Sequence, residues 1–208
     1  MRYYPINIAL SGQSVVVIGG GRIARNKIRP LLACGAVVTV IAPELDKILE
    51  CAARRGRLKY VRKKYQSGDL LHARLVIAAT NEPEVQKKVA QEAKQRRILL
   101  NVVDQPSLCD FTLPARVACG DFLVTISTGG EAPALAKKVR QDLEKHFAGY
   151  GRLVKVLGNI RRKCHDMPFQ QRARNFRKLL DSPLLTMLKR GDKKAVDRLV
   201  KKYFGRKV

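Results

Sequence analysis

Three consecutive glycines between a β-branched run and a helical pattern constrain this fold more than any other feature of the chain. The run Ser14–Ile18 is short, apolar and rich in valine, which is typical of a buried parallel strand. The segment Gly19–Gly21 follows it directly, and a helical pattern then extends over residues 23–33. A strand, a tight glycine turn and a helix in immediate succession are the opening of a βαβ unit.

Strand-like and helix-like segments alternate as far as residue 103. Apolar, β-branched runs predict the strands, and periodic apolar positions predict the helices between them. The expected strands are residues 14–18, 37–41, 59–61, 75–79 and 98–103, and the expected helices are residues 23–33, 45–55 and 82–96. This order predicts an α/β fold with a Rossmann-type, doubly wound parallel sheet and right-handed crossovers.

The alternation ends after Asp104. Strands are expected at residues 111–114 and 122–126, outside the parallel pattern, and a helix is expected to begin near Pro133. The remainder of the chain is basic and helical. We therefore expect three parts: a dinucleotide-binding domain at residues 1–113, a small α+β region at 114–149 and a C-terminal helical domain at 150–208.

Composition excludes several classes of protein. With 46% hydrophobic residues, the 208-residue chain is not disordered throughout. No apolar run approaches the roughly 20 residues that a membrane span needs, and the first residues lack the pattern of a signal peptide. The five cysteines lie apart without CxxC spacing and the three histidines are isolated, so we expect neither a disulfide framework nor a metal site. A reduced, cytoplasmic protein is expected.

The positive charge is the unusual quantity. The chain has 42 Lys and Arg against 17 Asp and Glu, a formal net charge of +25, and residues 151–208 carry +14 of it. Such a field attracts polyanions: nucleic acid, an anionic membrane surface, or a small molecule with many carboxylates or phosphates. The alternative is a solvated basic face, and charge alone does not distinguish these possibilities.

The segment Gly19–Ala24 fits the G-x-G-x-x-G/A fingerprint in the strand–turn–helix context that this motif requires. Gly19 permits the tight turn, Gly21 lets the backbone approach a pyrophosphate, and the small Ala24 lets the helix pack closely on the sheet. The helix N-terminus supplies N–H groups to the phosphates. The sequence therefore predicts a dinucleotide site at this turn.

One part of the fingerprint is missing, because no acidic residue ends the second strand to bind the adenosine ribose. Ala42 and Pro43 stand there, with Glu44 just beyond. Glu44 or backbone groups could take that place. Arg22 could meet a 2′-phosphate or lie beside the pyrophosphate, so the motif itself leaves NAD and NADP open.

Two further segments could carry chemistry. Asp104 follows a strand, and ligands bind at the carboxyl ends of strands in open α/β sheets. A carboxylate there could accept the proton that leaves when a hydride goes to a nicotinamide, and the alternative is a turn-forming aspartate. The loop Ser127–Pro133 brings hydroxyls and glycines to the start of a helix, where they could bind an anion or simply cap the helix.

Six segments carry a specific resemblance to a known family. They follow one another in order and, with the helix after the last of them, extend from residue 4 to about residue 147. They are Tyr4–Ile6, Val15–Lys27, Val40–Leu45, Ala78–Asn81, Asn101–Asp104 and Ser127–Pro133. With them the chain resembles the precorrin-2 dehydrogenases of sirohaem synthesis and the dehydrogenase/ferrochelatase half of the fused sirohaem synthases. It is similar to the stand-alone form, because no methyltransferase domain follows in this sequence.

The resemblance implies an NAD-dependent oxidation of precorrin-2, a tetrapyrrole with eight carboxylates, to sirohydrochlorin, with Asp104 as the general base. It implies cofactor contacts at Gly19, Gly21, Arg22, Ile23, Pro43 and Glu44. It implies substrate contacts at Asn101, Thr128, Gly129 and Gly130. It also implies a homodimer formed through residues 114–149, and a helical domain that covers the tetrapyrrole. Some relatives insert Fe²⁺ into the product and others do not, so ferrochelatase activity stays open.

An alternative function, from another class of protein, is an NAD(H)-sensing regulator that binds nucleic acid through the basic C-terminal region. It would need a helix-turn-helix or an aromatic stacking platform, and the aromatic residues of that region are few and irregularly placed. A reductase of small acids would need a Tyr-x-x-x-Lys pair or a catalytic histidine arrangement, which we do not find. We expect neither a nucleic-acid partner nor a membrane.

Overall fold

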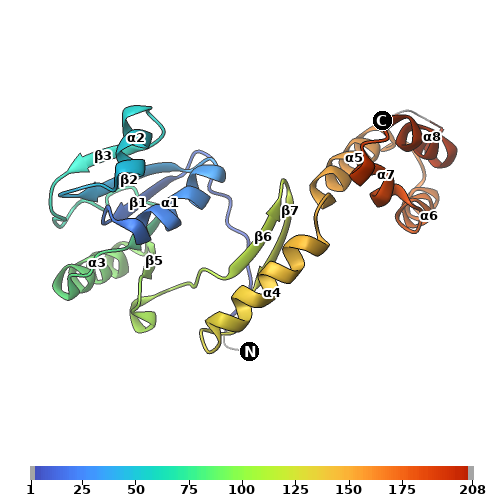
Figure 1. Cartoon of the computed structure of the whole chain (residues 1–208). Helices are drawn as coiled ribbons and strands as arrows, with labels where there is room; N and C mark the ends of the chain where they lie inside the picture. Colours follow the sequence, from blue (N-terminus) through green and yellow to red (C-terminus); the bar gives the residue numbers. More distant parts are fainter. Residues whose placement is uncertain (1–2, 206–208) are drawn as a thin grey trace. The chain divides into compact units, whose positions relative to one another are not determined.

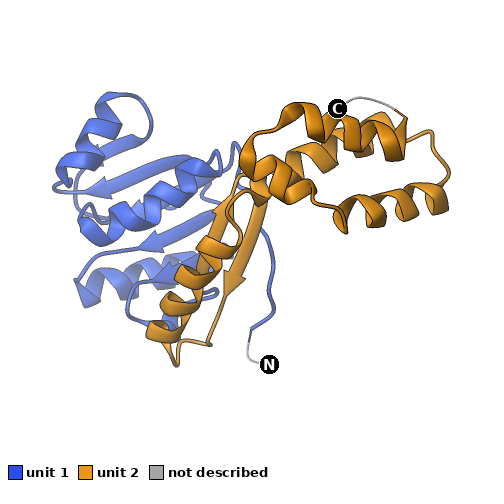
Figure 2. Cartoon of the chain, turned by 45° about the vertical axis from the view of Figure 1, so that its right-hand side comes forward, with its two compact units in different colours: residues 1, 3–113 blue, residues 2, 114–208 orange. Residues whose placement is uncertain are grey.

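The chain forms two compact units, shown in different colours in Figure 2. The structure, a computed structural model, describes residues 3–205. The first unit spans Tyr3–Leu113, and the second unit begins at Pro114. Each unit has hydrophobic clusters of its own.

The first unit is built on a five-stranded parallel sheet of order β3-β2-β1-β4-β5 (Figure 1). The strands are β1 (Ser14–Ile18), β2 (Val37–Ala42), β3 (Lys59–Arg62), β4 (Leu75–Ala78) and β5 (Leu99–Val102). Val15 of β1 pairs with Val38 on one side and with Leu75 on the other. The chain therefore winds outward in both directions from β1, and the strand order reverses between β1 and β4.

Helices cover both faces of this sheet. They are α1 (Arg22–Ala33), α2 (Lys47–Arg54) and α3 (Pro83–Arg96). Val15 and Val17 pack in one cluster with buried residues of α1 and α2, whereas Val16 and Ile18 pack in a second cluster with α3. Side chains alternate between the faces of a strand, so these valine-rich strands are buried on both sides. The predicted doubly wound α/β fold is confirmed.

The second unit combines a two-stranded antiparallel sheet with five helices among its described residues. The elements are β6 (Ala115–Cys119), β7 (Phe122–Ile126), α4 (Pro133–His146), α5 (Tyr150–Lys163), α6 (Phe169–Leu180), α7 (Leu184–Arg190) and α8 (Lys193–Phe204). The hydrophobic cluster of α5–α8 includes Ile160, Leu179 and Leu184, each almost fully buried. The expected helical C-terminal region is present.

One expected strand is wrong. Residues 111–114 are irregular, and the strand begins only at Ala115. Pro114 has no N–H to give to a sheet, and the carbonyl of Phe111 accepts a hydrogen bond from the Asn101 side chain instead of from a strand. The Phe111 ring packs against the first cluster of the first unit. The β-forming composition of this segment is overridden by these contacts.

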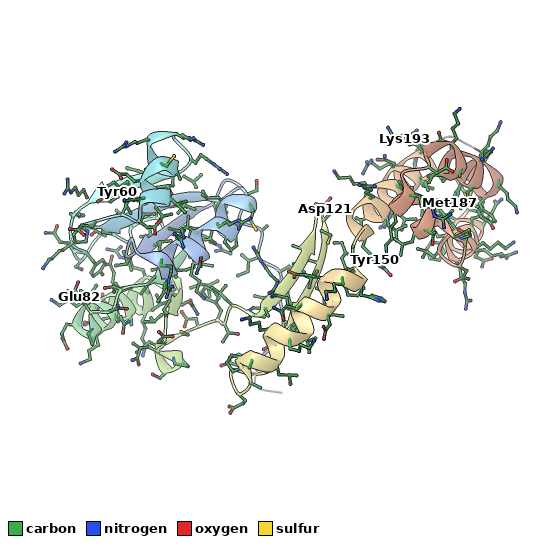
Figure 3. All side chains as sticks on the ribbon, in the orientation of Figure 1. Tyr60, Glu82, Asp121, Tyr150, Met187 and Lys193 are labelled. Atoms are coloured by element: carbon green, nitrogen blue, oxygen red, sulfur yellow. The ribbon has the colours of Figure 1, made fainter. Side chains whose placement is uncertain are left out.

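The four helices α5–α8 carry much of the charge. Long nitrogen-tipped side chains project outward from them in Figure 3, where Lys193 at the start of α8 is labelled. Arg152 and Arg172 are exceptions, since they donate hydrogen bonds to backbone carbonyls within the unit.

Over residues 3–205, no helix is long and apolar enough to cross a membrane.

Candidate functional site

Four loops of the first unit meet at the carboxyl edge of the parallel sheet, and hydrogen bonds join them. They follow β1, β2, β4 and β5. The amide of Gly19 donates to the carbonyl of Ile41 at 2.9 Å, and the amide of Ala79 donates to the carbonyl of Ile18 at 2.7 Å. The amide of Val103 donates to the carbonyl of Ala78 at 2.9 Å. The loops are therefore held side by side at the switch point of the sheet, where open α/β proteins bind ligands.

The glycine turn after β1 fits between its neighbours only because it lacks side chains. Gly19 has φ +108°, and a Cβ there would lie 2.3 Å from the carbonyl oxygen of Ala79. A Cβ on Gly20 would lie 2.1 Å from the carbonyl oxygen of Glu44. At Gly21, by contrast, a Cβ would meet nothing within 4 Å among the described residues. The turn is closed against the β2 and β4 loops and open at Gly21.

The N-terminus of α1 lies at this open position. Gly21 is its N-cap, no side chain of residues 3–205 caps it, and its first turn contains no acidic residue. Arg22 and Ile23 are exposed in that first turn, and Ala24 is fully buried under the helix. Uncapped amides, the positive end of the helix dipole and an unobstructed glycine suit a phosphate group. These residues fit the pyrophosphate of a dinucleotide.

The β2 loop presents Pro43 and Glu44, both exposed, beside that turn. The carbonyl of Pro43 accepts hydrogen bonds from the Tyr60 hydroxyl at 3.1 Å and from Arg62 Nε at 3.3 Å. Figure 3 labels Tyr60 on β3. The amide of Asp46 donates to the carbonyl of Gly20 at 2.7 Å. Two donors from the edge strand and one bond to the glycine turn fix the loop.

Asp46 also closes the loop onto helices α1 and α2. Its carboxylate accepts from the Ile48 amide at 3.0 Å and pairs with Arg25 of α1 at 2.9 Å. The bond from Ile48, with the Arg25 hydrogen bond and charge, holds the pKa of the Asp46 carboxyl below its usual value. The carboxylate caps α2 and is committed to this structural role.

Asp104 follows β5 in a tight turn. The amide of Gln105 donates to the carbonyl of Val102 at 3.4 Å, and Asp104 has φ +60°. This left-handed conformation is uncommon outside glycine, although aspartate adopts it more readily than most residues. The side chain is exposed, and no hydrogen bond to it is found from the described residues. Asp104 therefore forms a turn, as one interpretation of the sequence expected, and its carboxylate is also available, as the interpretation as a general base requires.

Asn101 lies on β5 and is 8% exposed. Its Nδ2 donates to the carbonyl of Phe111 at 2.9 Å, and the Cys109 thiol contacts the backbone of Val102. These contacts hold the segment that follows the Asp104 turn against β5. The structure thus shows a supporting role for Asn101, and its expected contact with substrate stays a prediction.

The loop of Thr128, Gly129 and Gly130 belongs to the second unit, ahead of α4. The Thr128 hydroxyl accepts from the Ala132 amide at 3.3 Å, and the amide of Gly129 donates to the Ser127 hydroxyl at 3.3 Å. Both glycines have positive φ and open surroundings. The N-cap of α4 is Ala132 and no side chain of the described residues caps the helix, so the capping that the sequence left as an alternative is not found. The Thr128 hydroxyl proton is still available to a ligand.

Sequence reasoning missed two groups that hold this edge in place. Tyr60 and Arg62 anchor the β2 loop, and Gln86 of α3 donates to the carbonyl of Thr80 at 2.7 Å in the β4 loop. Gln86 had a visible signal, because it is a polar residue in the buried stripe of α3 with Val89 and Ala93. Tyr60 and Arg62 had none beyond their place on an edge strand.

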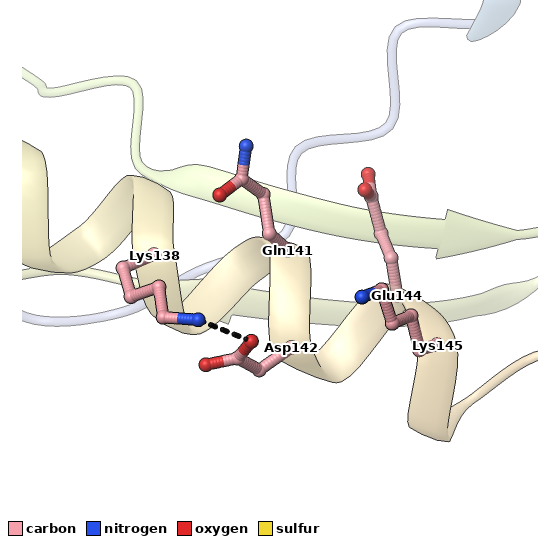
Figure 4. A pocket seen from close by; sticks show the side chains of 5 residues that line it. All are labelled: Lys138, Gln141, Asp142, Glu144 and Lys145. Carbon is pink, nitrogen blue, oxygen red and sulfur yellow. Dashed lines mark hydrogen bonds and ion pairs between the residues drawn. The ribbon is translucent and has the colours of Figure 1, made fainter.

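A surface hollow of about 520 Å³ lies elsewhere, on α4 (Figure 4). All five lining residues belong to this one helix: Lys138, Gln141, Asp142, Glu144 and Lys145. Lys138 pairs with Asp142 at 2.9 Å, so two of its charges are already matched. No group of three or more His, Cys, Asp or Glu that could hold a metal occurs within residues 3–205. We do not assign a site to this hollow.

A glycine-rich turn at the switch point of a parallel 3-2-1-4-5 sheet defines a dinucleotide-binding α/β protein. Residues 6–115 match the family model described as "Putative NAD(P)-binding", and residues 124–146 match "Sirohaem biosynthesis protein central". The chain belongs to the NAD(P)-binding precorrin-2 dehydrogenase and sirohaem synthase family, as the sequence predicted.

Individual proteins agree with this assignment. The siroheme synthase of Pseudomonas putida (strain W619) is 39% identical over 80% of this chain and 36% of that protein. The siroheme synthase of Chromobacterium violaceum is 36% identical over 94% of this chain and 42% of that protein. The chain thus spans about two fifths of the length of these curated relatives. A solved structure of "SirC, precorrin-2 dehydrogenase" covers 94% of this chain and 100% of its own, with 27% identity and a TM-score of 0.76.

Proposed function

We propose that this chain is an NAD-dependent precorrin-2 dehydrogenase, which oxidises precorrin-2 to sirohydrochlorin in sirohaem biosynthesis. The observation that carries this proposal is the available carboxylate of Asp104 on the same sheet edge as the open glycine turn. The similarity to the SirC structure over nearly the whole chain supports it.

In this reaction NAD⁺, when bound, accepts the hydride that leaves precorrin-2. The amides at the start of α1 would hold the pyrophosphate, with Gly19 closing the turn against the β4 loop, Gly21 leaving room for it and Arg22 and Ile23 beside it. Pro43 and Glu44 contact the adenosine half from the fixed β2 loop. Asp104 accepts the proton that leaves carbon, so one hydride and one proton are removed for each NADH formed.

The tetrapyrrole carries eight carboxylates, and the second unit supplies the matching charge. Thr128, Gly129 and Gly130 contact the substrate with a hydroxyl and loop amides, and Asn101 contributes from β5. Lysines and arginines of α5–α8 attract the carboxylates. We propose that residues 114–149 form a homodimer, that residues 150–208 cover the substrate, and that the enzyme works in the cytoplasm. The measured mass in solution tests the dimer.

The decisive experiment compares the wild type with Asp104→Asn in an anaerobic assay with precorrin-2 and NAD⁺. NADH and the sirohydrochlorin spectrum are followed together. We expect the variant to lose about 100-fold or more in kcat, the range for loss of a general base, while its Kd for NADH is unchanged. Asparagine adopts positive φ as readily as aspartate, so the turn is preserved.

Two other outcomes have distinct meanings, and one further test concerns ferrochelatase activity. Equal turnover by both proteins would place the general base elsewhere. Failure of the wild type to turn over while it still binds NADH would overturn the proposed reaction, and binding to duplex DNA would then be measured for the regulator alternative. Fe²⁺ added to the product tests ferrochelatase activity, in which Asp104 would remove pyrrole N–H protons and iron is a substrate.

A further inference from the structure

Gln86 is a buried polar residue whose side chain bonds to a loop at the site edge. It is 8% exposed and lies at the end of the first turn of α3, on the same stripe as Val89 and Ala93. A buried amide is costly unless it is hydrogen-bonded. The side-chain amide of Gln86 has its hydrogen-bond partner outside α3, since Nε2 donates to the carbonyl of Thr80 at 2.7 Å.

Thr80 belongs to the β4 loop, which lies between the glycine turn and the Asp104 turn. On one side the carbonyl of Ala79 occupies the position that a Cβ of Gly19 would need. On the other side the amide of Val103, next to Asp104, donates to the carbonyl of Ala78. Any displacement of the β4 loop therefore moves a wall of the cofactor turn and the strand end beside the general base.

The Thr80 hydroxyl also bonds to the start of α3. The Thr80 hydroxyl accepts from the Glu82 amide at 3.3 Å, directly before the helix begins at Pro83. Pro83 itself has no N–H to hold the loop. The side-chain amide of Gln86 is thus the donor that ties the carbonyl of Thr80 to the helix.

We propose that Gln86 is a positioning residue, which holds the β4 loop so that the glycine turn and Asp104 keep their spacing across the switch point. The inference rests on the proposed function for its link to catalysis, but the loop contact itself does not. Gln86 acts through Thr80, and the dinucleotide would lie across the crevice that this loop divides.

Gln86→Met tests the proposal, because methionine has a similar length and suits the buried stripe but leaves the Thr80 carbonyl without its donor. We expect the Kd for NADH, measured by nucleotide fluorescence, to rise at least about fivefold. Hydrogen exchange at the amides of residues 79–82 should become faster in protein without nucleotide. In turnover, KM for NAD⁺ should rise and kcat should fall.

Glu92→Gln is the matched control on the same helix. Glu92 is 4% exposed and accepts from the Tyr65 hydroxyl, the Gly68 amide and Arg96. Tyr65 and Gly68 belong to the segment that enters β4, at the opposite end of the strand, and Arg96 lies on α3 itself. We expect the control to lower the Tm while leaving the Kd for NADH and the exchange of residues 79–82 as in the wild type.

Gln86→Glu adds a readout that a purely structural role would not move. A protonated carboxyl donates to the Thr80 carbonyl, whereas an ionised one repels it. The Kd for NADH of this variant should approach the wild-type value near pH 5 and weaken towards pH 8. This variant also decides the question should the methionine variant not fold.

A wild-type Kd and wild-type exchange at residues 79–82 in Gln86→Met would overturn the inference, as would a pH-independent Kd in Gln86→Glu. Failure of the proposed function is a separate result. It would appear as wild-type protein that binds NADH but does not oxidise precorrin-2, with the binding and exchange measurements still deciding the role of Gln86.

Discussion

Gly20 and Gly21 are neighbours in one turn, yet they have different surroundings. Gly20 is buried with the carbonyl of Glu44 against its Cα, whereas Gly21 faces open space. We expect Gly20→Ala to destabilise the protein by about 2 kcal/mol or more, the scale of core overpacking, and to lower the Tm by about 5 °C. Thermal melts without nucleotide provide this measurement.

Gly21→Ala is the variant to compare with Gly20→Ala. Its Cβ meets nothing in the described structure, and Gly21 has an ordinary backbone conformation, with φ −83°. The Tm should therefore change little, while the Kd for NADH rises about tenfold because the methyl group occupies space that the pyrophosphate needs. Equal loss of NADH affinity in the two alanine variants, with equal loss of Tm, would contradict a phosphate site at Gly21.

At this scale the sequence predicted some roles and missed others for a physical reason. The glycines and Asp104 were predictable, since a turn between a strand and a helix, or a residue at a strand end, is set by neighbours in the chain. The contacts of Asn101 with Phe111 and of Gln86 with Thr80 depend on which carbonyls the fold leaves unpaired. Side-chain amides fit many environments, and their partners follow only from the fold.

At the scale of elements, α3 joins the sheet through a buried carboxylate. Burial of Glu92 acts to raise its pKa, but hydrogen bonds from Tyr65, Gly68 and Arg96 outweigh burial and hold the pKa below its usual value. Burial and the neighbouring carboxylate raise the pKa of the Tyr65 hydroxyl, so it remains a donor at neutral pH. The network ties the entry of β4 to the helix.

This network should make stability depend on pH. Because its folded-state pKa is lowered, ionised Glu92 stabilises the fold above the unfolded pKa of about 4.3, and the contribution is lost as pH falls through the folded value. Glu92→Gln should cost about 2 kcal/mol at pH 7 and less at about pH 3.5. Melts of both proteins at the two pH values measure this, and an equal Tm difference at both would contradict it.

Elements were predicted well where the pattern was long and local. The strands and helices of the alternating region agree to within a few residues, because buried strands and amphipathic helices have strong periodic signals. The exception, residues 111–114, is short and ends in proline. Its Phe111 packs on the first unit, and such a tertiary contact overrides β propensity.

At the scale of the whole molecule, the charge of +25 should be visible in kinetics. If the cations of α5–α8 attract a substrate with eight carboxylates, KM for precorrin-2 should rise several-fold between about 0.05 M and 0.5 M salt, because salt screens exposed charges. KM for NAD⁺ should change less, since helix-terminal amides hold the pyrophosphate.

Steady-state assays over this salt range measure both constants. A flat KM for precorrin-2 would remove the attractive role of the basic helices. Steeply salt-dependent binding to duplex DNA that NADH alters would favour the nucleic-acid regulator instead.

The division of the hydrophobic clusters along the chain has an evolutionary consequence. The clusters of the first unit draw on residues 8–111, and that of α5–α8 on residues 150–204. A genetic crossover near codon 113 would therefore leave every cluster intact and exchange whole units between homologous genes.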